Sequence, residues 1–540
     1  MIGRRTLLAA VGGTVATALT RRAGAQGSEA PVAATNHGKV RGAVKDGVNV
    51  FKGIPYGATT TSSRFKPASP PAPWTEVRDA FEFPPMSPQP VSNPTSLFKS
   101  WGTETKAGED CLGLNVWTPA LRDGVKRPVM VWFHGGDFAS SSGSRVVFDG
   151  ARLARKGDVV VVTLNHRLNV FGFLYLADLA PELADSGNVG MLDLVLALQW
   201  VRDNISEFGG DPSNVTIFGQ SGGGGKVSTM MAMPAGAGLF HRAIVQSGSY
   251  ARNAHLEAMR PEEAIKHART LFGALDIAPQ DAVRRLSEMP VEQLVAGYAK
   301  AARAQPRPNW RPVVDGRALP SGPGWPQAPA VSANVPLLIG STETEMTMLI
   351  GSFDPATFSL DENGLRSRLS RYFEVDDVEK VISTFAATRP NATPSDLFFA
   401  ITTANSFRRG AWTHADLKAA QNAAPVYLYE IDWKTPVEDG RWGSPHSLEH
   451  AFVFDNVAVS ESMVGPPTSE TQKMVEQIGA AWLAFARTGN PNNSAIPNWP
   501  AYKPAERATM VFNTDSKAVN AFRDDERKVL AEVSGRGPYD

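Results

Sequence analysis

The chain has 540 residues, and its 54 lysines and arginines are balanced by 54 aspartates and glutamates. This balance argues against nucleic acid as a partner, which would require an excess of positive charge. The single cysteine, Cys111, excludes an intrachain disulfide, and 42% hydrophobic residues with 48 glycines and 40 prolines indicate a loop-rich globular chain.

The N-terminal 25 residues have the pattern of a bacterial export signal. Paired arginines precede a short uncharged run, and small residues typical of a cleavage site follow it. In order, these are Arg4-Arg5, Thr6–Thr20 and Ala23-Gly24-Ala25. A disordered leader is the alternative, but the pattern favours a twin-arginine type of signal and a periplasmic or secreted protein. No later segment is a transmembrane candidate, so no membrane contact is expected once the signal is removed.

Beyond the signal, short apolar strands alternate with stretches of helical periodicity. The predicted strands are 128–133, 158–164, 215–218, 242–246, 335–339 and 425–431, and the predicted helices include 191–205 and 471–487. Residues 251–330 and 350–420 are expected to be helical excursions over the sheet. This alternation predicts an α/β fold with a mostly parallel sheet covered on both faces. Because no linker, repeat or charge block divides residues 26–540, we expect one domain there.

The most informative motif is a serine between glycines, directly after a predicted strand. The sequence GQSGG, with Ser221 at its centre, follows the apolar run 215–218 and fits G-x-S-x-G. A strand that turns sharply into a helix strains the serine backbone and projects its hydroxyl outward. Side chains at Gly219 and Gly223 would collide with the neighbouring elements. The pattern predicts a nucleophilic serine at one edge of the sheet, with a helix opening near Val227.

The same glycines also resemble a phosphate-binding loop. That motif requires a glycine five residues before its Gly-Lys pair and a serine or threonine after the lysine. Gln220 and Val227 occupy these two positions, so the phosphate-loop interpretation fails.

A serine nucleophile needs a base to take its proton and an acid to orient that base. Among nine histidines, His446 stands out because it lies in a loop after a predicted strand, downstream of Ser221. Glu345 and Glu343 both follow the strand 335–339, at the edge where catalytic groups of open sheets lie. The residues alone do not separate these two carboxylates.

The segment His446-Ser447-Leu448-Glu449-His450 also matches H-x-x-E-H, a zinc-peptidase motif. Zinc would need both histidines on one helical face and a third ligand further along the chain. Pro445 precedes the first histidine, and the serine motif described above already supplies a nucleophile. We therefore expect no metal and no other cofactor.

Nearly the whole chain after the signal resembles the type-B carboxylesterases, which have the α/β-hydrolase fold. The motifs that carry the likeness are FKGIPY at 51–56, EDCLGLNVW at 109–117, NHRL at 165–168, the segment 208–223 around Ser221, and TGNPN at 488–492. The resemblance implies a serine esterase with helical insertions over its active site.

Carried over by position, the resemblance implies a catalytic triad. Ser221 would be the nucleophile, Glu345 the acid and His446 the base. Glu449 would be a second carboxylate behind the histidine.

The resemblance also implies an oxyanion hole formed by the backbone N–H groups of Gly136, Asp137 and Gly222. The family usually has glycine or alanine at the position of Asp137. A carboxylate there is expected to point away from the oxyanion, because like charges repel.

Two further residues are candidates for contact with substrate. Lys226 is either a solvated lysine near a helix start or a cation that receives an anionic acyl group. The second interpretation would fit a narrower resemblance to fumonisin esterases, which release tricarballylic acid from a mycotoxin. Trp101 lies where cholinesterases place an aromatic ring for quaternary ammonium groups, and loop packing is the alternative.

These patterns predict a secreted serine carboxylic ester hydrolase that acts on a small-molecule ester through an acyl-enzyme, with fumonisin-type diesters as a candidate substrate. Amide or carbamate hydrolysis, or a general carboxylesterase with a neutral acyl preference, are alternatives, because the same triad serves them. A catalytically silent adhesion module on the same fold is a different class. The presence of all three triad residues argues against it.

Overall fold

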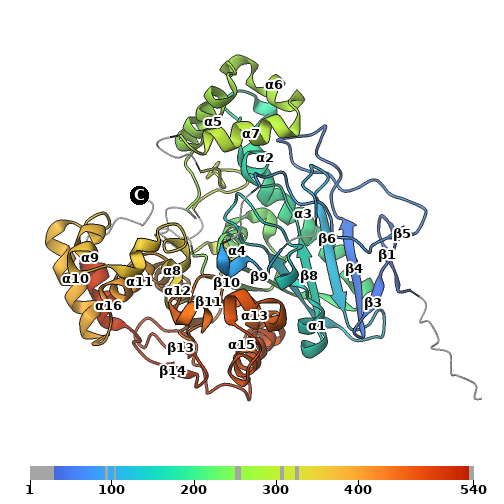
Figure 1. Ribbon diagram of the computed structural model, residues 1–540. Coiled ribbons are helices and arrows are strands. Elements are labelled where there is room, and N and C mark those ends of the chain that lie inside the picture. Colours follow the sequence, from blue (N-terminus) through green and yellow to red (C-terminus); the bar gives the residue numbers. More distant parts are fainter. Residues whose placement is uncertain are drawn as a thin grey trace, which may run out of the picture.

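The computed structural model describes residues 30–91, 95–102, 105–249, 257–304, 309–322 and 327–533. The predicted export signal, residues 1–25, lies outside the described residues. An 11-stranded sheet runs through the centre of the described part, and a 3-stranded sheet of order β1-β2-β5 lies near the start of the chain (Figure 1).

The large sheet is mostly parallel, with antiparallel strands at its two edges. Its order is β14-β13-β12-β11-β10-β9-β7-β8-β6-β4-β3, and every pair from β13 across to β8 is parallel. The strands are β1 (Val32–Thr35), β2 (Gly38–Arg41), β3 (Ala43–Lys45), β4 (Val48–Pro55), β5 (Arg78–Asp79), β6 (Gly113–Thr118), β7 (Arg127–Phe133), β8 (Val160–Leu164), β9 (Gly210–Gln220), β10 (Arg242–Gln246), β11 (Leu337–Thr342), β12 (Val426–Ile431), β13 (Thr509–Phe512) and β14 (Lys517–Val519).

Helices surround the sheet, and none in the described ranges combines the length and apolar character needed to cross a bilayer. They are α1 (Ala151–Gly157), α2 (Asn169–Phe173), α3 (Val189–Asn204), α4 (Gly222–Ala232), α5 (Pro261–Leu275), α6 (Ala282–Glu288), α7 (Val291–Ala301), α8 (Glu345–Leu349), α9 (Glu362–Leu369), α10 (Val375–Ala387), α11 (Pro394–Thr403), α12 (Arg409–Ala419), α13 (His450–Val453), α14 (Glu461–Val464), α15 (Ser469–Thr488) and α16 (Asp524–Glu532).

Alternate residues of the central strands belong to two separate hydrophobic cores, because successive side chains of a strand point to opposite faces. On β7, Val129 and Val131 pack in the core that includes α3 and α4, whereas Met130 and Trp132 pack in the core that includes α1 and α15. A sheet covered on both faces needs apolar residues at every position, and β7 is buried throughout.

The predicted α/β class and all six predicted strands are confirmed, with differences at the boundaries. Strand β9 begins at Gly210, well before the predicted Val215, because its first residues are polar and carry no hydrophobic pattern. Helix α4 begins at Gly222 rather than near Val227. Glycine is a poor helix former, but α4 packs against β9, β10 and β7, so tertiary packing outweighs local propensity here.

Helical excursions follow β10 and β11, as predicted. Helices α5, α6 and α7 gather at the top of the view and α9, α10 and α11 at its left (Figure 1). The first excursion is helical only as far as Ala301, and its described residues between 309 and 322 contain no helix. The insertions therefore leave the sheet at the carboxyl ends of its parallel strands, where open α/β sheets bind ligands.

A buried ion pair fastens the loop after β8 to α3 and gives a stability prediction. Arg167 and Asp193 are 2% and 0% exposed, and Nη2 of Arg167 lies 2.6 Å from Oδ1 of Asp193. Asp193→Asn should leave a buried guanidinium without its counter-charge and lower the free energy of unfolding by about 3–5 kcal/mol in urea titration. The matched control is Asp203→Asn on the same helix, which removes an exposed pair and should cost about 1 kcal/mol or less. Equal losses in the two variants would contradict the prediction.

Candidate active site

The carboxyl ends of four parallel strands lie in register, and this alignment gathers the predicted triad. Gln220 on β9 pairs with Gln246 on β10, which pairs with Gly340 on β11, which pairs with Tyr429 on β12. Ser221 directly follows the first of these strands. Residues 345 and 446 come after the third and fourth. Three residues far apart in the sequence therefore emerge at the same edge of the sheet.

Ser221 has the strained backbone expected of a nucleophile at a strand-to-helix turn. Its φ is 58° and its ψ is −128°, a combination that non-glycine residues rarely adopt. A Cβ on Gly219 would lie 2.5 Å from the carbonyl carbon of Gly223, and one on Gly223 would lie 2.0 Å from the carbonyl oxygen of Phe133. Both glycines are therefore required for the turn, for the steric reason that the sequence motif implied.

Glu345 holds the imidazole of His446. The Nδ1 atom of His446 makes a short hydrogen bond to Oε2 of Glu345, and both side chains are almost fully buried. The other carboxylate oxygen, Oε1, accepts the backbone N–H of Thr342 at 2.8 Å. This arrangement keeps Nδ1 on the carboxylate, so Nε2 is the ring nitrogen that could act as a base.

The loop that carries His446 is attached to the residue before the serine. The Oγ atom of Ser447 donates to Oε1 of Gln220 at 3.0 Å, and Nε2 of Gln220 lies 3.3 Å from Nε2 of His446. No hydrogen bond joins the Ser221 hydroxyl to His446 among the described residues. Such contacts in free enzymes often form only in the complex with substrate. The bridging role of Gln220 was not predicted from the sequence, although the position of this residue next to the nucleophile could have suggested it.

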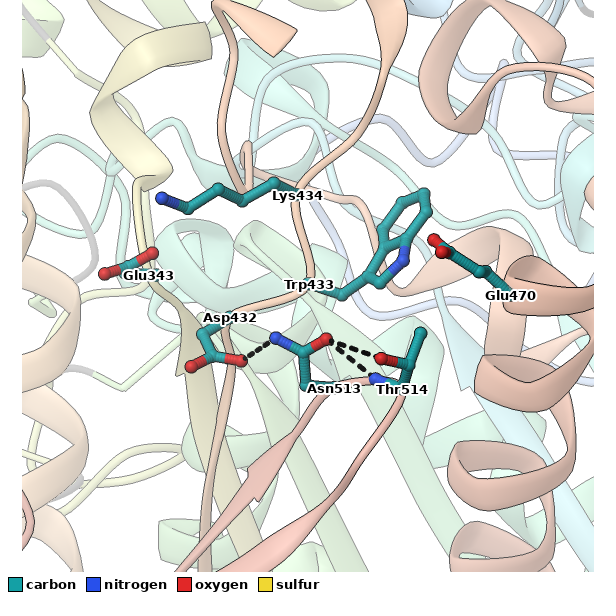
Figure 2. Close-up of a pocket in the computed structure, with 7 residues that line it drawn as sticks. All are labelled: Glu343, Asp432, Trp433, Lys434, Glu470, Asn513 and Thr514. Atoms are coloured by element: carbon teal, nitrogen blue, oxygen red, sulfur yellow. Dashed lines mark hydrogen bonds between the residues drawn. The ribbon is translucent and has the colours of Figure 1, made fainter.

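Glu343, the rival carboxylate, lies in a different environment. Its Oε1 is 2.9 Å from Nη2 of Arg523, and it lines a polar pocket of about 430 Å³ with Asp432, Lys434 and Asn513 (Figure 2). The structure therefore separates the two carboxylates that the residue pattern left open. Glu345 is on the histidine, and Glu343 is paired with an arginine.

The predicted oxyanion loop follows β7 and lies against the start of α4. Gly136 and Asp137 have φ values of 81° and 56°, in the left-handed region that glycine and aspartate tolerate best. A Cβ on Gly222 would lie 2.3 Å from the Cα of Asp137, so the two backbones are in direct contact. Neither the Gly136 nor the Asp137 N–H donates a hydrogen bond to another described residue. These donors are available to a ligand atom beside Ser221.

The carboxyl group of Asp137 is hydrogen-bonded by the side chain of Asn309, and burial raises its pKa above the ordinary value. The positive charges of Arg311 and Lys226 oppose that rise.

Lys226 is not the solvated lysine that the sequence suggested. It is completely buried, and its ammonium donates to the carbonyl oxygens of His134 at 2.9 Å and Asp137 at 2.7 Å. The hypothesis that it receives an anionic acyl group therefore finds no support in its position, because its donors are directed at the backbone of the oxyanion loop.

Trp101 packs within its loop and does not present an open aromatic face. Its side chain is 2% exposed, and Nε1 donates to Oγ of Ser460 at 3.0 Å. The rings of Phe98 and His450 lie 5.0 and 5.4 Å away, centroid to centroid. Of the two interpretations of Trp101, loop packing agrees with this buried position, and contact of its ring with substrate finds no support there.

Glu449 is a second buried carboxyl group behind the histidine. Burial, reinforced by the charge of Glu345, raises its pKa to about 8. Hydrogen bonding from the side chains of Gln246 and Ser247 opposes this rise only in part. Glu449 therefore differs from Glu345, whose carboxylate is hydrogen-bonded to the ring of His446.

The two histidines of the zinc-like motif lie in separate environments. Nδ1 of His446 is bonded to Glu345, whereas the ring of His450 packs edge-on against Trp132 and Phe148, at centroid distances of 5.4 and 5.2 Å. Burial lowers the pKa of His450 well below its usual range. His450 therefore has the surroundings of a core residue.

Comparison with known proteins gives a consistent family. A model described as the carboxylesterase family matches residues 29–529. The chain is 35% identical to the para-nitrobenzyl esterase of Bacillus subtilis, covering 93% of this chain and 99% of that one, and 32% identical to the phenmedipham hydrolase of Pseudarthrobacter oxydans, covering 91% and 96%. Among solved structures, a carboxylesterase from Geobacillus stearothermophilus superimposes with a TM-score of 0.79 at 37% identity, over 92% of this chain and 99% of that one.

These matches extend over almost the whole described chain. They confirm the α/β-hydrolase fold and the resemblance drawn from the sequence motifs. The chain belongs to the carboxylesterase family and is an enzyme of the serine carboxylesterase class.

Proposed function

We propose that this carboxylesterase hydrolyses small-molecule carboxylic esters through an acyl-enzyme formed on Ser221. The observation that carries the proposal is the hydrogen bond between Glu345 and Nδ1 of His446, in a loop that Ser447 fastens to Gln220 beside the serine. This brings an oriented base next to a strained, outward-facing hydroxyl.

In the first half of the reaction, Oγ of Ser221 attacks the ester carbonyl carbon and its proton passes to Nε2 of His446. Glu345 holds the Nδ1–H and stabilises the imidazolium that forms. His446 then donates the proton to the departing alcohol. A water molecule attacks the acyl carbon in the second half, with His446 again accepting and returning a proton, and the acid is released.

Both tetrahedral intermediates carry a negative oxygen, which the N–H groups of Gly136, Asp137 and Gly222 would stabilise. These donors are fixed by the contact between the loop and α4, so they need no reorganisation when charge develops. Loss of one such donor typically lowers the rate by about 100- to 1000-fold.

Ser221→Ala tests the nucleophile. The variant should lower kcat for a chromogenic ester by about a million-fold, because no covalent intermediate can form. Wild-type protein should be labelled at one residue by an organophosphate, and mass spectrometry of the digest should place the adduct on Ser221. Turnover by Ser221→Ala near the wild-type rate would refute the assignment.

The two neighbouring glutamates provide a matched test of the acid. Glu345→Gln should lower kcat by about 1000- to 10,000-fold, because an amide cannot hold the imidazole in the same tautomer or stabilise its charge. Glu343→Gln alters a carboxylate paired with Arg523 and should leave kcat within about threefold of wild type. Comparable losses in both variants would mean that Glu345 acts through stability rather than through His446.

The position of Lys226 limits the range of acyl groups that we propose for the substrate. The fumonisin-type proposal depended on a cation in the acyl pocket, and this lysine is bonded to backbone carbonyls instead. The name of the para-nitrobenzyl esterase relative supports an ester with a neutral aromatic alcohol and does not specify the acyl group. We therefore favour a general carboxylesterase with a neutral acyl preference over tricarballylate release, with amide or carbamate hydrolysis as the second alternative.

A panel of esters that share one alcohol decides between these acyl groups. Neutral short-chain acyl esters should have kcat/KM at least about tenfold above tricarballylate half-esters, because the ammonium of Lys226 is bonded to backbone carbonyls instead of being available to an anionic acyl group. A higher kcat/KM for the polycarboxylate ester would instead support an acyl pocket that binds anionic groups. Anilide and carbamate analogues measured alongside would reveal a broader hydrolase.

We also propose that residues 1–25 direct export and that residues 26–540 form a single hydrolase domain. The family match over residues 29–529 supports the start of the catalytic part just after the signal. Residues 1–25 themselves rest on their sequence pattern alone.

A further inference from the structure

A lysine that reaches the oxyanion loop from inside the molecule is the most unusual feature of the site. Lys226 belongs to α4, the helix that starts at the nucleophile, and its side chain is 0% exposed. Its ammonium donates to the carbonyl oxygens of His134 and Asp137 at 2.9 and 2.7 Å. The ring of Phe138 lies 5.5 Å from the same nitrogen. These contacts connect the helix to the loop independently of any substrate.

The carbonyl groups of His134 and Asp137 flank the part of the loop that carries the proposed oxyanion donors. The N–H groups assigned to the oxyanion lie on Gly136 and Asp137, between the carbonyl of His134 and the carbonyl of Asp137. Holding both carbonyls restricts rotation of the peptide groups between them. The direction of the two N–H donors therefore depends on where the lysine nitrogen sits.

Helix geometry explains how the side chain arrives there. A helical side chain leans back toward the N-terminus and lies over the residue four positions earlier. For Lys226 that residue is Gly222, whose missing side chain lets the helix touch Asp137. The missing side chain of Gly222 therefore allows the helix to approach the loop, and the side chain of Lys226 extends across this contact.

Burial of the Lys226 amine costs free energy, so we expect this residue to have a specific role. Burial lowers the pKa of Lys226 to about 7, and the nearby carboxyl group of Asp137 offsets the change only in part. The other titratable neighbours, His134 and His166, are buried, and burial and the charge of Lys226 both lower their pKa. A neutral amine keeps two N–H groups, which is enough for both carbonyl oxygens. The hydrogen bonds that hold the loop therefore do not require a positive charge on Lys226.

We propose that Lys226 is a positioning residue that sets the geometry of the oxyanion hole by holding the carbonyls on either side of its N–H donors. This inference rests on the proposed function, because it concerns the same tetrahedral intermediates. It assigns Lys226 to transition-state stabilisation and not to substrate recognition.

The chain offers a matched control in a second buried lysine. Lys418 is 1% exposed, and its ammonium donates to the carbonyl oxygens of Ser332 and Ala333, both at 2.7 Å. It lies on α12, whereas the nucleophile, the base and the oxyanion loop all lie on other elements. Lys226→Met and Lys418→Met thus remove the same group from similar surroundings, one beside the oxyanion loop and one elsewhere.

The experiment measures both variants with a neutral chromogenic ester and with an aryl trifluoromethyl ketone, which forms a tetrahedral oxyanion on the serine. Lys226→Met should lower kcat by about 10- to 100-fold with KM within about threefold of wild type. Its affinity for the ketone should fall in parallel. Lys418→Met should lose thermal stability but keep kcat and ketone affinity within about threefold of wild type.

Several outcomes would overturn the inference. The first is that Lys226→Met and Lys418→Met have equal kcat and equal affinity for the ketone. The second is that Lys226→Met changes KM and leaves kcat at the wild-type value. If Lys226→Met does not fold, Lys226→Gln, which keeps N–H donors on a shorter side chain, must show the same parallel losses to a smaller extent, and wild-type values in it would refute the proposal. Failure of the proposed function would appear differently, as absent ester turnover or ketone binding in the wild-type protein itself.

Discussion

Backbone lies directly on backbone where the start of α4 meets the loop after β7, and only glycine permits the approach. A Cβ on Gly222 would come within 2.3 Å of Asp137, and one on Gly135 within 2.9 Å of the carbonyl oxygen of Gln220. Because of this contact, N–H groups from two separate elements converge beside Ser221. The same contact accounts for the first two of the four glycines that open α4, because a Cβ on Gly223 would lie 2.0 Å from the carbonyl oxygen of Phe133. Each glycine costs about 1 kcal/mol of helix propensity relative to alanine.

The buried charges around this contact are arranged so that one carboxylate serves the histidine. Glu345 accepts hydrogen bonds from both the His446 ring and the backbone N–H of Thr342. Glu449 is also buried nearby, and burial together with the charge of Glu345 raises its pKa to about 8. The two carboxyl groups therefore have different surroundings, and of these two only Glu345 is hydrogen-bonded to the imidazole in the described part of the chain.

Much of the fold was predictable because the central strands are buried on both faces and therefore read as continuous apolar runs. The proximity of Glu345 and His446 to the strand end that carries Ser221 was predictable for a different reason: parallel strands end at one edge, so segments that follow β9, β11 and β12 leave the sheet there. The choice between Glu343 and Glu345 depended on which way each side chain turns, and the residue pattern has no signal for that without the family resemblance. The start of β9 was missed because polar residues such as Asp211 and Asn214 belong to that strand.

The role of Lys226 was missed because a lysine is normally interpreted as a surface residue. The prediction that α4 opens near Val227 placed it before the helix and free to be solvated. Once α4 is known to begin at Gly222, the four-residue spacing puts Lys226 above the glycine that touches the oxyanion loop. From there its N–H groups reach the carbonyl oxygens of His134 and Asp137, so the direction of the oxyanion donors is set before substrate binds. Donors that are already aligned need no reorganisation when a negative oxygen forms beside them. Alignment of this kind lowers the barrier without any requirement for the charge of the lysine.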